Sequence, residues 1–146
     1  MTDQPKEDAE FLLAAVLPFA RSMIERHGEF HPYGGYLTVQ REVVDVGAEV
    51  RGQEHPDPSE LVKLLRSDFV RLRRQGGLVA AAVVTHVRIH PPGEEEASDA
   101  IQVSLEHTDA FSVEVFEPYR EDADGGFTFG HPFAFAQEGS YWLQDA

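Results

Sequence analysis

The sequence predicts an α+β domain in which an antiparallel sheet of about five strands is flanked by two helices. Two segments carry apolar residues at helical spacing, the others alternate or are β-branched, and glycine and proline separate them. The expected order is helix, strand, strand, helix, strand, strand, strand, followed by an irregular aromatic C-terminal segment. A chain of 146 residues with 42% hydrophobic residues has the size and composition of one domain. Residues 1–146 are therefore predicted to share one core, with residues 1–7 as a disordered tail.

The first helix is predicted from Asp8 to His27. Its apolar residues recur every three or four positions, and they are Phe11, Leu12, Ala15, Val16, Phe19, Ala20, Met23 and Ile24. Pro18 lies inside this segment and lacks the amide that would bond to the carbonyl four residues earlier. We therefore expect either a kink or two short helices meeting there. Gly28 is placed to form a left-handed C-terminal cap.

A β-hairpin is expected next, from residues 36–39 and 43–46, because β-branched and aromatic residues lie on both sides of a short polar link. Residues 47–56 are polar and predict a loop. The segment Asp57-Pro58-Ser59-Glu60 is the clearest helix start, with a capping Asp, a proline in the first helical position and a glutamate three residues after the cap. A second helix is predicted over 57–75, and Gly76-Gly77 ends it.

The remainder predicts sheet. Residues 78–89 are almost continuously apolar and β-branched, which favours a central strand, with a helix as the alternative. Residues 101–107 and 111–115 alternate apolar and polar side chains and predict a second hairpin with one face in water. Residues 91–99 and 118–126 are expected to be acidic loops. The aromatic C-terminal segment, 127–143, either covers an open part of the sheet or presents a contact surface.

The formal net charge of -14 is unevenly distributed. Residues 1–88 hold 11 Lys and Arg against 13 Asp and Glu, whereas residues 89–146 hold only Arg120 against 13. Such a surface repels nucleic-acid phosphates and anionic membranes, so neither is predicted as a partner. It favours solubility or a basic protein partner, and the second helix carries five basic residues that are suited to pair with the acidic half or with a second copy.

The chain contains no cysteine, which excludes disulfides and thiolate chemistry and favours a reducing compartment. The first residues lack the pattern of a secretory signal, and no stretch approaches the ~18 apolar residues that a membrane span needs. A cytoplasmic location is expected. The motifs of serine hydrolases, phosphate loops, dinucleotide sites and zinc proteases are missing, so the sequence predicts no catalytic residue and no cofactor.

Two loops with a His-Pro-aromatic pattern are the first candidate for a ligand site. They hold His31 and Tyr33 in one loop and His131 and Phe133 in the other. A proline after each histidine holds the backbone extended, which would direct the imidazole into a cleft beside an aromatic wall. Ordinary turn chemistry explains both loops equally well.

A metal site is the second candidate. His86 and His90 share the parity of one strand face, and Glu106 would lie near His86 if the two strands pair in a suitable register. Imidazole and carboxylate are ligands that suit zinc or a similar ion. Solvation of these three side chains on the wet face of a sheet is the ordinary alternative.

The order of elements over residues 10–117 resembles the profilin-like layout of roadblock and longin modules. The segment from Leu17-Pro18-Phe19-Ala20 to Gly28-Glu29-Phe30-His31-Pro32-Tyr33-Gly34 is also similar to small uncharacterised bacterial proteins. The roadblock likeness implies a scaffold that binds or dimerises. The sequence thus predicts a non-enzymatic protein-interaction module, either a homodimer or an inhibitor-like or immunity-like protein with a basic partner. The alternative is a small-ligand or metal-binding protein or enzyme with a histidine and aromatic cleft.

Overall fold

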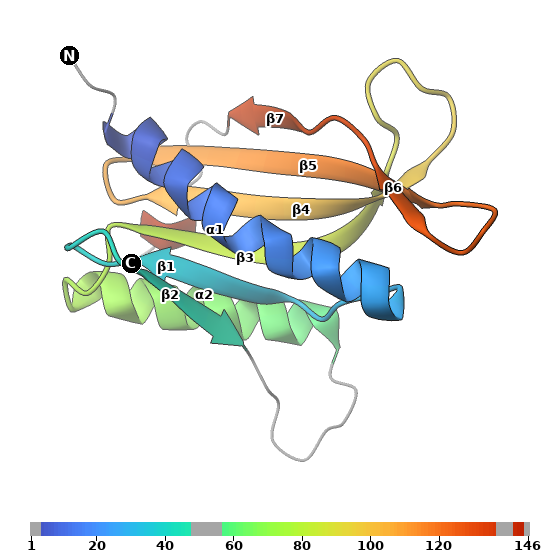
Figure 1. Ribbon diagram of the computed structural model, residues 1–146. Helices are drawn as coiled ribbons and strands as arrows, with labels where there is room; N and C mark the ends of the chain where they lie inside the picture. Colours follow the sequence, from blue (N-terminus) through green and yellow to red (C-terminus); the bar gives the residue numbers. More distant parts are fainter. Residues whose placement is uncertain (1–3, 48–56, 137–141, 145–146) are drawn as a thin grey trace.

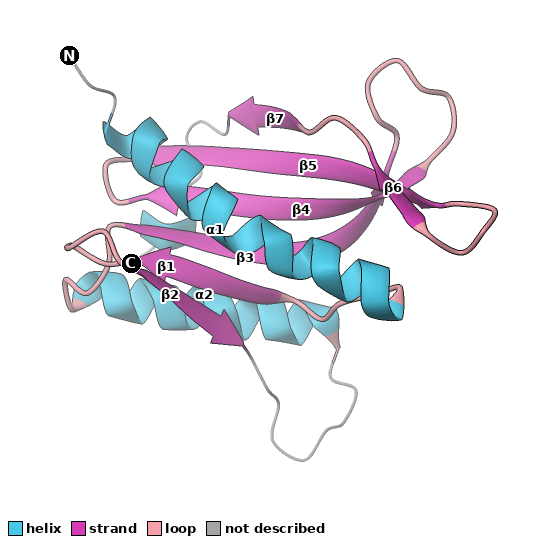
Figure 2. Ribbon diagram, viewed as in Figure 1, coloured by secondary structure: helices cyan, strands magenta, loops and turns pink. Residues whose placement is uncertain are grey.

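The computed structural model describes residues 4–47, 57–136 and 142–144. These residues form one antiparallel sheet with a helix on each face (Figures 1 and 2). The elements in chain order are α1 (Gln4–His27), β1 (Tyr33–Leu37), β2 (Val43–Gly47), α2 (Pro58–Arg74), β3 (Ala80–Ile89), β4 (Ser98–His107), β5 (Phe111–Glu121), β6 (Phe127–Phe129), β7 (Phe133–Ala136) and the 3-10 turn η1 (Trp142–Gln144). The strand order is β2-β1-β3-β4-β5-β6, and β7 also pairs with β5. The predicted α+β class and order are confirmed.

Side chains of the central strand β3 alternate between two apolar clusters. Ala80, Ala82 and Val84 pack with α1 on one face of the sheet. Ala81 and Val83 pack with α2 on the other face. Because successive side chains of a strand point to opposite faces, a buried strand between two helices needs apolar residues at every position. This explains the continuous apolar run, and it decides the strand against the alternative helix.

Helix α1 begins at Gln4, so residues 4–7, predicted to be part of a disordered tail, are helical; residues 1–3 lie outside the described residues. The helix runs through Pro18 as one element rather than as two short helices. It ends at His27, and Gly28 follows with a φ of 77° and an amide bond to the Ile24 carbonyl, which match the predicted left-handed cap.

Helix α2 starts as the sequence predicts. The Asp57 carboxylate accepts hydrogen bonds from the amide and the hydroxyl of Ser59, both at 2.9 Å, and Pro58 occupies the first helical position. The helix ends at Arg74, and Gly76 follows with a φ of 72°. Most of the preceding predicted loop, residues 48–56, lies outside the described residues.

The second hairpin is longer than the sequence indicates. Strand β4 starts at Ser98 and β5 continues to Glu121, so parts of both predicted acidic loops are strand. Pro118 lies within β5, and its carbonyl faces the side on which β6 and β7 pair, where it accepts from the Gly130 amide at 2.7 Å. Its missing N–H therefore faces the same side and costs no bond to β4.

The aromatic C-terminal segment supplies two further strands, so the described sheet has seven strands rather than about five. β6 pairs with β5 at residues 119–121, and β7 pairs with β5 at residues 113–116. Trp142 and Leu143 pack into the cluster beneath α2. Phe135, by contrast, is 53% exposed, so the segment both covers the sheet and leaves an aromatic side chain in solvent.

Candidate functional site

The two His-Pro-aromatic loops line separate cavities, and Tyr119 lies on the wall of both. His31 lines a cavity of about 510 Å³ together with His86, Asp99, Tyr119 and Phe127. His131 and Phe133 line a second cavity of about 450 Å³, on whose wall Tyr119 also lies. The fold therefore brings His31 together with His86, one of the predicted metal ligands, and not with His131.

Tyr33, a predicted ligand residue, holds the first helix instead. Its hydroxyl donates to the Val16 carbonyl and accepts from the Ala20 amide at 3.0 Å. These are the two groups that a regular helix bonds to each other, so the hydroxyl is inserted into the helix ladder beside Pro18. Burial raises the pKa of Tyr33, consistent with a phenol that stays neutral. Both sides of the hydroxyl are thus used within the fold.

The three predicted metal ligands are not brought together. His86 pairs with Ile101, whereas Glu106 pairs with Ala81, five positions away along β3. An odd number of positions places two side chains on opposite faces of the sheet, so the register excludes a shared ion. The third ligand, His90, has its Nδ1 at 3.1 Å from the Glu95 carbonyl. Within the described ranges, no group of three or more His, Asp or Glu side chains is arranged to hold a metal.

The cavity around His31 and His86 is the first of two candidate sites. Strand β1 ends its pairing with β3 at Tyr33 and Val84, so β3 extends past it and the turn after α1 roofs the space. His86 Nε2 lies 2.9 Å from Asp99 Oδ1, and its ring lies 6.3 Å from that of Tyr119. Burial, with the nearby Asp99 carboxylate, raises the pKa of Tyr119 to about 12. The site offers hydrogen-bond donors and acceptors beside aromatic rings.

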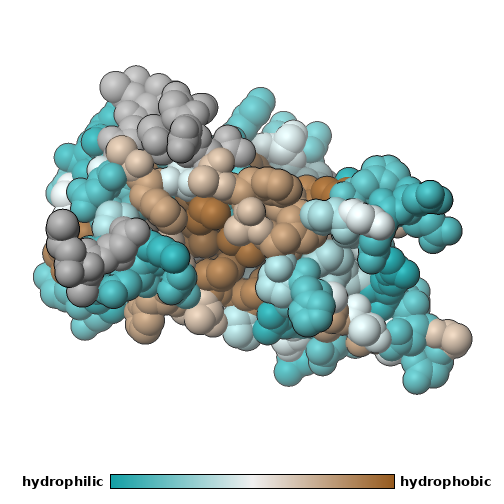
Figure 3. Space-filling model, turned by 90° about the horizontal axis from the view of Figure 1, so that it is seen from above, coloured by the Kyte–Doolittle hydropathy of each residue, from teal (hydrophilic) through white to brown (hydrophobic). Residues whose placement is uncertain are grey.

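An apolar groove of about 320 Å³ is the second candidate site. Helix α1 packs mainly on β1, β3 and β4 and runs beside the first part of β5 and β7, so a hollow remains between the helix and these strands (Figure 1). Seen from the side of β5 and β7, the space-filling view of Figure 3 shows apolar side chains gathered at the centre of the molecule. One wall is formed by α1, and the floor and far wall by β4, β5 and β7, with lining residues Ala9, Leu13, Leu17, Leu105, Val113 and Val115. Phe133 lies on its rim, so this predicted site residue borders the groove as well as the cavity beside His131.

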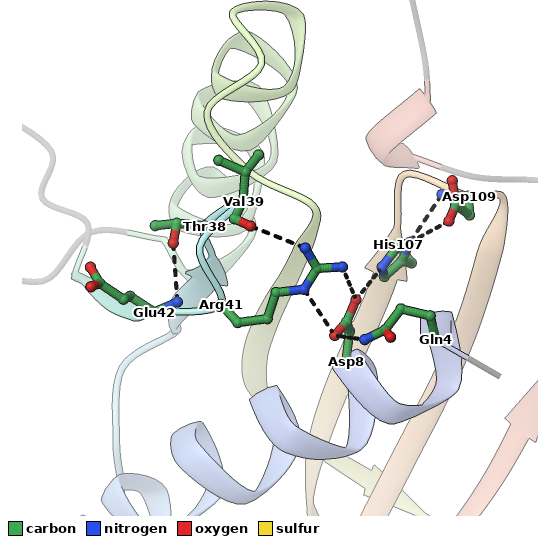
Figure 4. Close-up of polar contacts among 8 residues, drawn as sticks. All are labelled: Gln4, Asp8, Thr38, Val39, Arg41, Glu42, His107 and Asp109. Atoms are coloured by element: carbon green, nitrogen blue, oxygen red, sulfur yellow. Dashed lines mark hydrogen bonds and ion pairs between the residues drawn. The ribbon is translucent and has the colours of Figure 1, made fainter. Parts of the chain in front are cut away.

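A buried ionic cluster closes one end of the domain, and sequence reasoning missed it (Figure 4). Asp8 and His107 are 3% and 2% exposed, and Asp8 Oδ2 lies 2.8 Å from His107 Nε2. Gln4 donates to the other carboxylate oxygen at 2.7 Å, and Arg41 adds an ion pair at 3.2 Å. The Asp109 amide donates to His107 Nδ1, which assigns the remaining proton to Nε2 and directs it to Asp8.

The electrostatics of this cluster favour an ionised Asp8. Burial by itself would raise the pKa of Asp8, but hydrogen bonds from His107, Gln4 and Arg41 outweigh it and hold the pKa below its ordinary value. The cluster ties three segments together, because Asp8 belongs to α1, Arg41 to the β1–β2 turn and His107 to the end of β4. Its role is structural, since Nδ1 of the imidazole already accepts a backbone amide.

Comparison of the chain with protein-family models, with curated proteins and with solved structures finds no match. None of the helices in the described ranges is long and apolar enough to cross a membrane.

Proposed function

We propose that this protein is a non-enzymatic protein-interaction module that docks an apolar segment of a basic protein partner in the groove between α1 and β5. The observation that carries the proposal is the groove itself, an apolar hollow between α1 and strands β4, β5 and β7. Isolated exposed apolar residues need no explanation, but a continuous apolar hollow is typical of interaction sites.

The lining of the groove favours a macromolecular segment over a small ligand. Small-ligand pockets combine apolar walls with a few polar groups that converge and orient the ligand. Among the described residues, the charged side chains that line this groove are Lys6 and Glu10, both on α1. A segment that presents a row of apolar side chains matches such a lining, as in helix-in-groove recognition.

Charge favours a basic partner over a second copy of the chain. The net charge is -14, and residues 89–146, which include β4, β5 and β7, hold 13 acidic residues and one basic residue. Two copies would repel each other through this field, whereas a basic chain would be attracted and its association accelerated. An inhibitor-like or immunity-like role fits this arrangement better than homodimerisation.

A designed peptide tests the proposal with the full-length chain. The probe is an amphipathic helix with leucine along one face and lysine along the other, titrated by calorimetry at low and high salt. We expect saturable binding that weakens with salt, and about tenfold weaker binding to Leu13→Glu, equivalent to ~1.4 kcal/mol. Phe11→Glu is the matched control, because Phe11 is an exposed apolar residue of α1 that does not line the groove.

Two results would contradict the groove as the docking site. One is equal binding to Leu13→Glu and Phe11→Glu when both retain the helical signal of the parent chain. The other is a complex between two copies of the chain in light scattering, with no binding of the basic peptide. The first result would mean that the peptide is held by non-specific charge attraction and not in the groove. The second would favour the homodimer predicted from the sequence as an alternative.

The cavity around His31 and His86 supports a second candidate function, the binding of a small organic cation. Carboxylates of Glu29, Asp99 and Glu121 line it beside the rings of Tyr119 and Phe127, a combination suited to an amine. Titration with a panel of aliphatic and aromatic amines, followed by amide NMR, should shift signals of residues 28–31, and Asp99→Asn should reduce the shifts. Unchanged spectra at millimolar amine would remove this candidate.

A further inference from the structure

The C-terminal turn η1 occupies a pocket on the α2 face of the sheet, opposite the groove. Leu143 is fully buried there, against a cluster that includes Leu65 and Phe69 of α2. The indole of Trp142 lies 6.2 Å from the ring of Phe69, and the guanidinium of Arg66 lies 5.6 Å above the indole. The pocket thus holds one leucine and one tryptophan in adjacent positions.

The backbone of the same dipeptide is held by a buried carboxylate. Glu106, which is 1% exposed, accepts from the Leu143 amide at 2.8 Å and from the Trp142 amide at 3.1 Å. The Ser112 hydroxyl donates to the same carboxylate at 3.0 Å, and the indole N–H donates to the Ser104 hydroxyl at 3.1 Å. Backbone contacts and side-chain pockets are the two components of a peptide-recognition site.

A carboxylate is an unexpected group for holding a turn that packs on an apolar cluster. Burial raises the pKa of Glu106 and so opposes its ionised form, and the two backbone amides and Ser112 act against that effect. Apolar packing alone would anchor Leu143 without burying a charge. Glu106 therefore selects for the backbone of the bound segment, whose two amides it accepts from, in addition to the leucine side chain.

We propose that Glu106, Ser104, Arg66 and Phe69 form a recognition site for a Trp-Leu segment, which the chain's own residues 142–144 occupy in cis and which a partner segment with the same pair occupies in trans. The occupant is defined by the one seated there, an indole followed by leucine with both amides directed to Glu106. The site lies on the opposite face of the sheet from the groove, so its test is independent of the proposed function.

A peptide with the sequence of residues 140–146, Ser-Tyr-Trp-Leu-Gln-Asp-Ala, is the probe. The receptor is the full-length Trp142→Ala/Leu143→Ala variant. It contains no tryptophan, because Trp142 is the single tryptophan of the sequence. Fluorescence of the peptide should therefore shift to the blue on binding without background from the protein. We expect saturable binding to this variant and at least about tenfold weaker binding to the parent chain, whose own tail competes.

Two controls test whether the recognition site is specific for the Trp-Leu segment. A peptide with alanine in place of leucine, and a receptor carrying Glu106→Gln in addition, should each bind about tenfold more weakly than the reference pair. The proposal is overturned if the double variant unfolds cooperatively like the parent chain yet binds no peptide at millimolar concentration. Should that variant not fold, Leu143→Ala is the receptor and 5-fluorotryptophan in the peptide is observed by ¹⁹F NMR. Saturable binding of that peptide would again support the proposal, and no binding at millimolar concentration would overturn it.

Discussion

Asp8 and His107 are 99 positions apart in the chain, and their side chains meet in the interior at 2.8 Å. The pair joins the start of α1 to the end of β4, and Arg41 adds the β1–β2 turn to the same carboxylate. Arg41 has a φ of 63°, an uncommon conformation for a residue with a side chain. The ion pair to Asp8 therefore holds the turn in a conformation that local preference disfavours.

Substitution of Asp8 by asparagine should destabilise the fold. The amide retains the shape of the carboxylate but loses the charge that His107 and Arg41 pair with, so we expect a loss of about 1–3 kcal/mol in the free energy of unfolding. Urea denaturation measures it. The matched control is Glu10→Gln, an exposed carboxylate on the same helix, which should change the stability by less than about 0.5 kcal/mol. Equal effects of the two substitutions would show that the buried cluster contributes little.

The same carboxylate predicts a pH dependence. The folded protein holds the pKa of Asp8 below its ordinary value, so the unfolded chain binds the proton more readily. The stabilisation is therefore fully present above the ordinary pKa of about 3.8 and is lost as the pH falls through the lower pKa of the folded state. Unfolding curves from pH 6 to pH 2 should lose stability less steeply in Asp8→Asn than in the parent chain. Parallel pH profiles would contradict the assignment.

The Tyr33 hydroxyl predicts a coupling with Pro18. Tyr33→Phe leaves the Ala20 amide and the Val16 carbonyl without their bridging group, and we expect a loss of about 1–3 kcal/mol. In a Pro18→Ala background the helix can close its ladder directly, so the same substitution should cost less. A double-mutant cycle by thermal or urea unfolding gives the coupling energy. Additive effects would mean that the hydroxyl does not compensate for the proline.

Gly34 predicts a steric requirement in β1. A Cβ atom at this position would lie 2.4 Å from the Ala82 carbonyl oxygen and 3.0 Å from the ring of Phe69. Gly34→Ala should therefore destabilise the fold by about 1–3 kcal/mol through displacement of β1 or α2. Gly47→Ala is the control, because no atom of the described residues, apart from its chain neighbours, lies within 4 Å of its Cβ position. Comparable denaturation midpoints for the two variants would argue against the close packing of β1 under α2.

The ion pair between Arg21 and Glu117 predicts a difference between arginine and lysine. The Glu117 carboxylate is buried and accepts from two nitrogens of Arg21, one of them at 2.7 Å. Arg21→Met removes both donors and should cost about 1–3 kcal/mol, whereas Arg21→Lys keeps the charge but not the paired geometry and should cost less. Thermal unfolding of the two variants gives the order. A methionine variant as stable as the lysine variant would contradict it.

The sequence predicted the starts and ends of the helices well, because capping and glycine signals depend on interactions between residues close together in the chain. The capped start at Asp57 and the glycine end at Gly28 depend on groups within a few residues, and both are confirmed. The predicted hairpin was too short because residues 98–99 and 118–121 fell within segments predicted to be acidic loops, and only their pairing with β3, β4 and β6 places them in the sheet. The profilin-like resemblance stays a prediction.

The candidate sites were less accessible to sequence reasoning. His31 and His131 share a local pattern, yet the fold sends them to different cavities, and the register of β3 with β4 separates His86 from Glu106. The Asp8–His107 pair had no local signal, because a lone aspartate in a helix is usually solvated. Only an alternative view of Asp8, as a polar residue on the apolar face of α1 next to Leu12, would have indicated a buried partner.

The sequence by itself determined the alternation of helices and strands, because periodicity and capping record how each segment lowers its own free energy. Tertiary structure alone decided which face of the sheet each side chain occupies, which distant charges meet, and where an apolar hollow remains. These depend on strand register and on the path of α1 across the sheet, to which residues far apart in the chain contribute jointly. For the same reason, the groove beside β5 and the recognition site around Glu106 exist only in the folded molecule and have no local sequence signal.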